Sequence, residues 1–207
     1  LGSLVLTAAP NAPPDTLPNA STAFAATFDV LIGGSCGAEG VLPAAGCGAA
    51  GLSFSFGDGL EAVAPFGEEG AGSGLRLQIL TGDGSRRLVV IYGGQVLASV
   101  GLNETIRSHA IPVQLAVQYA ADGLWVRLDT TQLVAGLGIP GWSPRRTWRF
   151  GFGARTGSAW GAHDSHAVDN VEIRLGRLGA ASGAVPVEVS LNGAQFSHGG
   201  LMYTYLP

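Results

Sequence analysis

Trp148-Arg-Phe-Gly-Phe-Gly-Ala-Arg-Thr-Gly157, followed closely by His166-Ala-Val-Asp-Asn-Val-Glu-Ile173, is the stretch that decides the fold. Aromatic residues alternate with glycine in the first run, and this period of two is typical of a β-strand with one buried face. The glycines of its other face, Gly151 and Gly153, indicate a curved strand or the close approach of another segment. The second run is also strand-like, so the sequence predicts two strands joined by the polar loop 158–165.

The same alternation recurs along the chain. It predicts further strands at Ser3–Thr7, Phe24–Ile32, Leu52–Phe56, Leu75–Leu80, Leu88–Tyr92, Gln95–Val100, Val113–Tyr119 and 124–129. Asp122-Gly123 between the last two runs predicts a hairpin. Thr130–Leu137 could form one or two helical turns. Many short strands separated by turns indicate an all-β sandwich or jelly roll.

Composition agrees with this architecture. The 207 residues suffice for one large β domain plus an appendage, and 33 glycines with 13% charged residues suit short strands and turns. The net charge of −4 argues against nucleic acid or an anionic membrane as a partner. No apolar run approaches the ~20 residues of a membrane span. The chain opens at Leu1 without Met or a signal peptide, so we expect a mature or excised piece of a longer protein.

Two cysteines and two sequons favour an oxidising, extracellular setting. Cys36 and Cys47 lie in one Gly/Ala-rich segment, where an even pair closing a short loop suits a disulfide, with two free thiols as the alternative. Asn19-Ala-Ser and Asn103-Glu-Thr match the acceptor pattern for N-glycosylation.

The order of these runs resembles that of a concanavalin A-like (L-type lectin-like) jelly roll over residues 1–177. The motifs that carry the resemblance are Gly2-Ser-Leu-Val-Leu-Thr, Phe24-Ala-Ala-Thr-Phe-Asp-Val, Gly51-Leu-Ser-Phe-Ser-Phe, Ile139-Pro-Gly-Trp and the Trp148–Ile173 pair. The resemblance implies an antiparallel β-sandwich that serves in recognition.

The C-terminal part differs in composition. Residues 178–184 are predicted to be a linker, and 185–207 resemble the last strands of a filamin-type or IPT/TIG immunoglobulin-like repeat. We expect two adjacent antiparallel strands here that lie outside the jelly-roll core. They would pack on immunoglobulin-like strands from beyond residues 1–207 or on a neighbouring copy.

The resemblance also implies that the metal and sugar sites of the family are altered. The family's sugar-binding Asp falls on Ala50, and its Ca²⁺/Mn²⁺ ligands fall on Gln78 and Leu80. A carboxamide lacks the charge of a carboxylate, and a leucine offers no ligand. Asp83, in the loop that follows, could supply one.

Several polar and aromatic residues are candidates for a ligand site, although ordinary structural roles are the alternative for each. Tryptophan faces can stack on sugar rings, and the densest polar group lies in and after the 158–165 loop. The candidates are Trp142, Arg155, Trp160, His163 and Asp164. Asp169 is expected to share an inward face with Val171 and Ile173. A buried carboxylate needs donors or a cation, so a structural Ca²⁺ is one interpretation and backbone amides or Arg the other.

No catalytic pattern stands out. Glu68-Glu69 are adjacent in a Gly-rich turn, which does not provide the carboxylate spacing of a glycosidase, and we find no nucleophile elbow or phosphate loop. The sequence therefore favours a non-catalytic extracellular or cell-surface recognition module that binds glycan or protein. The alternative is a structural spacer of an extracellular fibre or ciliary scaffold.

Overall fold

The computed structural model describes residues 2–8, 23–33, 50–60, 66–82, 86–103, 106, 111–145, 147–155, 165–176, 184–190 and 202–204. For residues 2–8, 176, 184–190 and 202–204 it describes the backbone alone. The described residues form an antiparallel β-sandwich and contain no α-helix.

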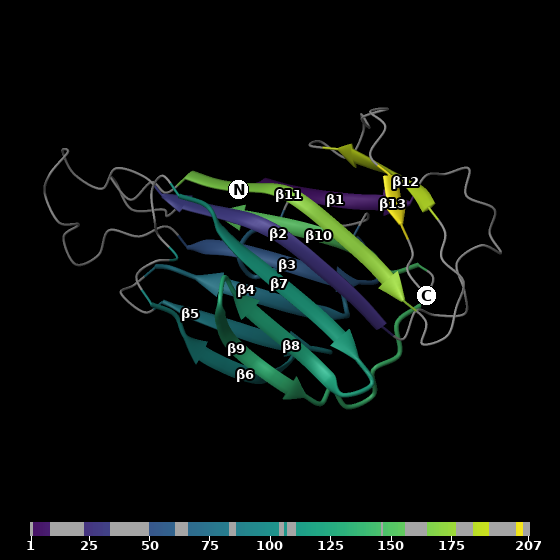
Figure 1. Cartoon of the computed structure of the whole chain (residues 1–207), viewed down its shortest axis with the longest axis horizontal. Coiled ribbons are helices and arrows are strands. Elements are labelled where there is room, and N and C mark those ends of the chain that lie inside the picture. Colours follow the sequence, from purple (N-terminus) through teal and green to yellow (C-terminus); the bar gives the residue numbers. More distant parts are fainter. Residues whose placement is uncertain are drawn as a thin grey trace, which may run out of the picture.

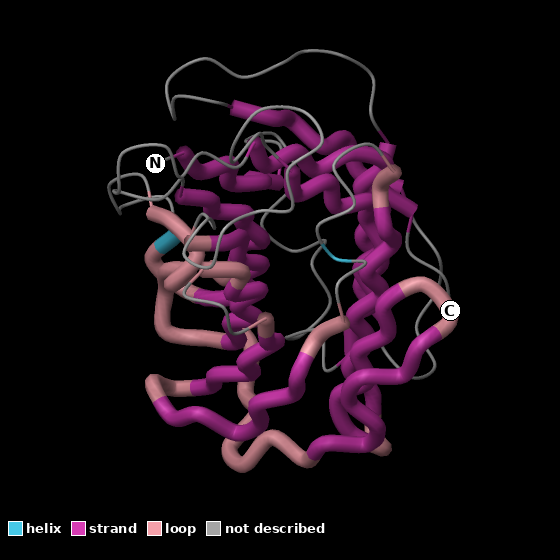
Figure 2. Tube along the Cα trace, turned by 90° about the vertical axis from the view of Figure 1, so that its left-hand side faces the viewer, coloured by secondary structure: helices cyan, strands magenta, loops and turns pink. Residues whose placement is uncertain are grey.

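Two antiparallel sheets face each other as layers (Figure 2). The eight-stranded sheet runs in the order β13(Met202–Thr204), β12(Ala184–Ser190), β1(Gly2–Ala8), β10(Arg149–Arg155), β3(Gly51–Gly57), β4(Leu75–Leu80), β5(Arg87–Tyr92), β6(Gln95–Gly101). The five-stranded sheet runs in the order β11(Ser165–Gly176), β2(Ala23–Gly33), β7(Val113–Ala120), β8(Gly123–Leu128), β9(Thr131–Leu137) (Figure 1).

The core lies between the sheets and is rich in aromatic rings. Phe28 of β2 meets Phe152 of β10 edge-on at 4.8 Å between centroids, and Phe56 stacks on Phe150 at 4.2 Å. All four rings are buried. Each buried side chain of this size contributes roughly 1.5–3 kcal/mol through removal of apolar surface from water.

The strands predicted from alternation are confirmed, and the structure adds one more. Thr130–Leu137, where the sequence allows one or two helical turns, contains the strand β9. Its pairing with β8 follows a two-residue turn in which Asp129 has a φ of 48°. Since Val134 reaches the core from this strand, pairing at the sheet edge outweighs the weak local helical preference.

The C-terminal strands pair with each other, as the sequence predicted, through Val185↔Tyr203 and its neighbours. However, β12 also pairs with β1, with Leu6↔Val189 and Thr7↔Glu188 in register. The tail therefore continues the large sheet, as Figure 1 shows beside β1, and the expectation that it packs on strands from outside residues 1–207 is wrong for β12. Its immunoglobulin-like character and the domain boundary at 177 stay predictions.

No helix in the described part of the chain is long and apolar enough to span a membrane.

Candidate functional site

The outer face of the eight-stranded sheet is covered by a turn, and the sequence of β3 explains why. Phenylalanine and serine alternate in this strand, so that Phe54 and Phe56 enter the core while Ser53 and Ser55 face outward. Both serines are nevertheless fully buried. The segment that buries them is Phe66–Gly74, which lies across β10, β3 and β4.

Side chains of the sheet fasten this segment from below. Ser53 Oγ donates to the carbonyl of Gly67 at 2.6 Å, and Ser55 Oγ accepts from the backbone amide of Ala71 at 3.2 Å. The turn itself closes through Gly70 N–H to Gly67 O at 3.1 Å, with Gly70 at a φ of +67°. Buried hydroxyls that are paired in this way hold the segment in one position.

Close approach depends on a glycine in β10. A Cβ atom on Gly153 would lie 2.4 Å from the Phe66 ring and 2.6 Å from the Gly67 carbonyl oxygen. The sequence-based expectation that the glycines of this strand admit a neighbouring segment is therefore confirmed for Gly153. The absence of a side chain there lets the turn rest directly on the strand.

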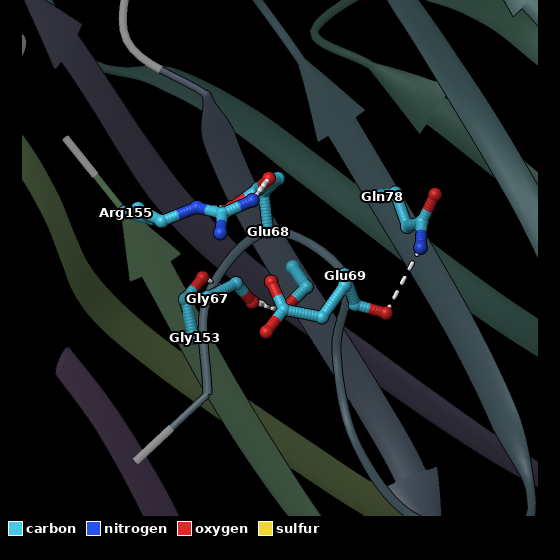
Figure 3. A network of polar contacts seen from close by, with 7 residues as sticks. Gly67, Glu68, Glu69, Gln78, Gly153 and Arg155 are labelled. Atoms are coloured by element: carbon cyan, nitrogen blue, oxygen red, sulfur yellow. Dashed lines mark hydrogen bonds and ion pairs between the residues drawn. The ribbon is translucent and has the colours of Figure 1, made fainter. Parts of the chain in front are cut away.

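An ion pair holds the turn to the sheet at the C-terminal end of β10. The Arg155 guanidinium donates from Nε to Glu68 Oε2 at 2.9 Å and from Nη2 to Glu68 Oε1, so the pair is bidentate. The Glu68 side chain is 10% exposed and that of Arg155 is 49% exposed. Figure 3 shows the two side chains facing each other above Gly67 and Gly153. We call this pair the clamp.

The clamp leaves hydrogen-bonding groups exposed at the surface. Because Glu68 occupies only part of the guanidinium, the solvent-facing N–H groups of Arg155 stay available in a fixed orientation. Glu69 lies beside it and is exposed. A held donor next to an exposed carboxylate is suited to hydrogen bonding with hydroxyl groups of a ligand.

Glu69 is kept ionised by its surroundings. Although partial burial raises the pKa of this carboxyl, backbone hydrogen bonds at Glu69 and Gly67 and the positive charge of Arg155 together hold the pKa below its ordinary value of 4.5.

This lowered pKa predicts a pH-dependent contribution to stability. The folded form favours the ionised carboxylate, so the contribution is complete above about pH 4.5 and is lost as the pH falls through the folded value. We expect the difference in unfolding free energy between the wild type and Glu69→Gln to shrink between about pH 6 and pH 3. Urea unfolding at several pH values measures it, and a difference that stays constant over this range would contradict the assignment.

The residues at the family's metal positions do not fit a divalent cation. Gln78 is on β4, as expected, but its Nε2 donates to the carbonyl of Glu69 at 2.9 Å and so holds the turn. Leu80 carries no donor atom. Asp83 lies outside the described residues. Over the described ranges, no group of three or more His, Cys, Asp or Glu side chains could hold a metal ion.

The sequence-predicted site residues do not all come together. Arg155 is at the clamp. Trp142 lies at the opposite end of β3, where its ring is 4.1 Å from that of Tyr119 and 6.1 Å from that of Phe24. It is half-buried against the core, so it packs on neighbouring rings at the rim of the sandwich. Its stacking on a sugar stays a prediction.

The expectation that Asp169 points inward is wrong. A bulge between Asp169 and Glu172 shifts the register of β11, with Asn170 at a φ of 49°. The inward face therefore passes from Val168 to Ile173, and Asp169 is exposed. Burial of a carboxylate, the reason for expecting Ca²⁺ there, does not hold.

The remaining candidates fall largely in segments that the structure does not describe. These are Asn19, Cys36, Cys47, Trp160, His163 and Asp164. Asn103 is described and exposed, directly after β6. The disulfide and the glycosylation sites stay predictions.

Comparison with known proteins identifies the class of fold. The chain matches the crystal structure of the VIP36 exoplasmic/lumenal domain in its Ca²⁺/Man-bound form, at a TM-score of 0.52 and 16% identity, over 73% of this chain and 67% of that one. It matches the Ca²⁺/Man3GlcNAc-bound form at 0.53 and 15% identity, over 75% and 71%. It also matches the potassium-bound carbohydrate recognition domain of Emp46p at 0.51 and 16% identity, over 75% and 72%.

These likenesses establish the concanavalin A-like fold predicted from the ordered motifs. No model of a protein family matches the chain, and no curated protein matches its sequence.

Proposed function

We propose that this chain is a non-catalytic, lectin-like recognition module that binds carbohydrate at the clamp. The observation that carries the proposal is the Arg155 guanidinium, held bidentately by buried Glu68 yet about half exposed, beside the exposed Glu69 carboxylate. Fixed charged donors and acceptors at one place give orientation-specific hydrogen bonds to hydroxyl groups. VIP36 structures with bound mannose show the same fold in a sugar complex.

The segment after β10 supports the same location. Trp160, His163 and Asp164 follow Arg155 closely in sequence, and we propose that they contribute to the same ligand. Binding is proposed to be independent of Ca²⁺, since Gln78 and Leu80 do not supply the family's ligands.

The setting is proposed to be extracellular or at a cell surface, as part of a larger multidomain protein that takes part in adhesion. The predicted Cys36–Cys47 disulfide and the sequons at Asn19 and Asn103 support an oxidising, secretory location. The VIP36 domain is described as exoplasmic/lumenal, which agrees with this setting.

A structural spacer in an extracellular fibre or ciliary scaffold is the second candidate. It is favoured by Gln78, whose amide fastens the turn instead of serving a ligand, and by Ala50, which stands where the family has its sugar-binding Asp. In that case the clamp would serve stability alone.

A glycan array probed with and without Ca²⁺ separates the two functions. We expect the wild type to bind a glycan equally in Ca²⁺ and in EDTA, and Arg155→Gln to lose at least about tenfold in affinity because charge-assisted bonds are removed. Arg145→Gln is the matched control, since the Arg145 side chain is 76% exposed and pairs with Asp58, just beyond the end of β3 opposite the clamp. No binding in either condition would favour the spacer, and binding only with Ca²⁺ would contradict the metal-free site.

A further inference from the structure

A second groove lies on the outer face of the five-stranded sheet, on the opposite side of the sandwich from the clamp. Its floor is made of small side chains from two neighbouring strands, Ala25 and Thr27 of β2 and Ala116 of β7. The groove has a volume of about 260 Å³. This is slightly below the ~300 Å³ at which small-molecule pockets begin, so it suits one ring of a longer ligand.

The strand register builds one wall of the groove from larger side chains. Ala25 pairs with Gln118, which pairs with Trp125, while Thr27 pairs with Ala116, which pairs with Arg127. Arg127 in turn pairs with Gln132 of β9. The small residues on the outward face are thus bordered by larger polar side chains: the indole of Trp125, the guanidinium of Arg127 and the carboxamides of Gln118 and Gln132.

Some of these groups are held in place by the protein. Trp125 is 37% exposed, and its Nε1 donates to Asp122 Oδ2 at 3.1 Å, which fixes the indole on the hairpin. Gln132 Nε2 donates to the carbonyl of Val126 at 2.9 Å and also to that of Val134. The ring and the Gln132 carboxamide are therefore positioned before a ligand arrives.

Other polar groups of the groove have no partner in the described residues. These are the Thr27 hydroxyl, the Gln118 carboxamide and the Arg127 guanidinium. Arg127 is the single charged residue among those that line the groove, and no carboxylate lines it. The carboxylates around the groove are bonded by other groups. In the next outward row, Asp29 Oδ2 accepts from Asn170 Nδ2 at 2.7 Å and Asp129 Oδ1 from the Gln114 amide at 2.8 Å, while Glu172, which pairs with Thr27, accepts from Arg174 Nε at 2.8 Å. Arg127 forms no ion pair among the described residues, and a guanidinium in this state can bind an anionic group bidentately.

We propose that this groove binds an oligosaccharide through a carboxylate-bearing sugar residue. The Arg127 guanidinium donates two parallel hydrogen bonds to the sugar carboxylate, Trp125 contacts the apolar face of a ring, and Gln118 and Thr27 form hydrogen bonds with hydroxyl groups. A second copy of the chain fits less well, because a sheet-to-sheet contact would bury the Arg127 guanidinium without a carboxylate among the lining residues to pair with it.

The test titrates the full chain with three uronic-acid probes: oligogalacturonate, oligomannuronate and a hyaluronan fragment. Each is compared with its carboxyl-reduced counterpart by calorimetry. We expect at least one acidic probe to bind, its reduced form to bind at least about tenfold more weakly, and Arg127→Gln and Trp125→Ala each to weaken binding at least about tenfold. Arg145→Gln is the control.

Several results would overturn the proposal. They are no binding of any acidic probe, equal binding of the reduced form, or wild-type affinity in Arg127→Gln. Light scattering that shows a wild-type dimer and a monomeric Trp125→Ala would identify a second copy as the occupant. Because the clamp and the groove lie on opposite sheets, failure of glycan binding at the clamp would leave this titration unaffected.

Discussion

Replacement of Gly153 by alanine is expected to lower the free energy of unfolding by about 1–3 kcal/mol, because an added methyl group overpacks a closed contact. The new Cβ would lie 2.4 Å from the Phe66 ring and 2.6 Å from the Gly67 carbonyl oxygen. The backbone oxygen cannot rotate away, so the turn must lift from the sheet. Lifting it also separates Glu68 from Arg155, and glycan binding at the clamp should fall with stability.

Urea unfolding measures the loss, and Gly101→Ala is the matched control. Gly101 is also a strand glycine of the same sheet, but a Cβ there would meet nothing within 4 Å. This control should be neutral or slightly stabilised, since alanine restricts the unfolded chain. Equal stability of both variants would show that the turn does not rest on Gly153.

Trp142→Ala is expected to lower the free energy of unfolding by about 3 kcal/mol, the lower end of the range for large aromatic side chains, because the ring is half-buried against the core. The Trp142 ring lies within 6.1 Å of those of Phe24, Phe56, Tyr92, Tyr119 and Trp148, measured between ring centroids. It thereby closes the end of the sandwich opposite the clamp. Tyr92 reinforces the closure through its hydroxyl, which donates to Gly141 O at 3.0 Å.

Trp125→Ala provides the comparison on the surface. Trp125 is 37% exposed on the outer face of β8 and packs on no described ring of the core, so its removal should cost about 1 kcal/mol, well below the loss for Trp142. Thermal and urea unfolding of both variants test the assignment. A Trp142→Ala variant with wild-type stability would show that this ring does not close the sandwich, and would favour its role as a ligand platform.

Most of the fold could be predicted from the sequence, because the alternation of apolar and polar residues indicates which face of a strand is buried. The run Phe24–Ile32 illustrates this, since every second residue from Phe24 to Ile32 is buried in the core. The wrong predictions fall where the pairing of neighbouring strands outweighs the local sequence pattern. Asn170 at positive φ introduces a bulge that turns Asp169 outward, and β9 forms because an edge position was open beside β8. Alternation alone cannot locate a bulge.

The candidate site was largely missed, for a different reason. The sequence shows Glu68 only as one of two adjacent glutamates without glycosidase spacing, whereas in the structure it is the buried carboxylate of the clamp. Its partner Arg155 is 87 residues away in sequence, and only the sheet brings them together. Two local signals did point to the place: the outward serines of β3 and Gly153 of β10, both of which admit the turn.

The central claim is that the clamp binds carbohydrate without a divalent cation, and amide chemical-shift mapping in EDTA tests it most directly. A neutral glycan that binds on the array would be titrated into the ¹⁵N-labelled chain. A neutral ligand is chosen because the Arg127 groove is proposed to require a carboxylate, so binding there would not contribute to the shifts. Binding at the clamp predicts saturable shifts at the amides of Gly67–Gly70 and Gly153–Arg155. Shifts confined to other parts of the chain, or binding that appears only after Ca²⁺ is restored, would contradict the account.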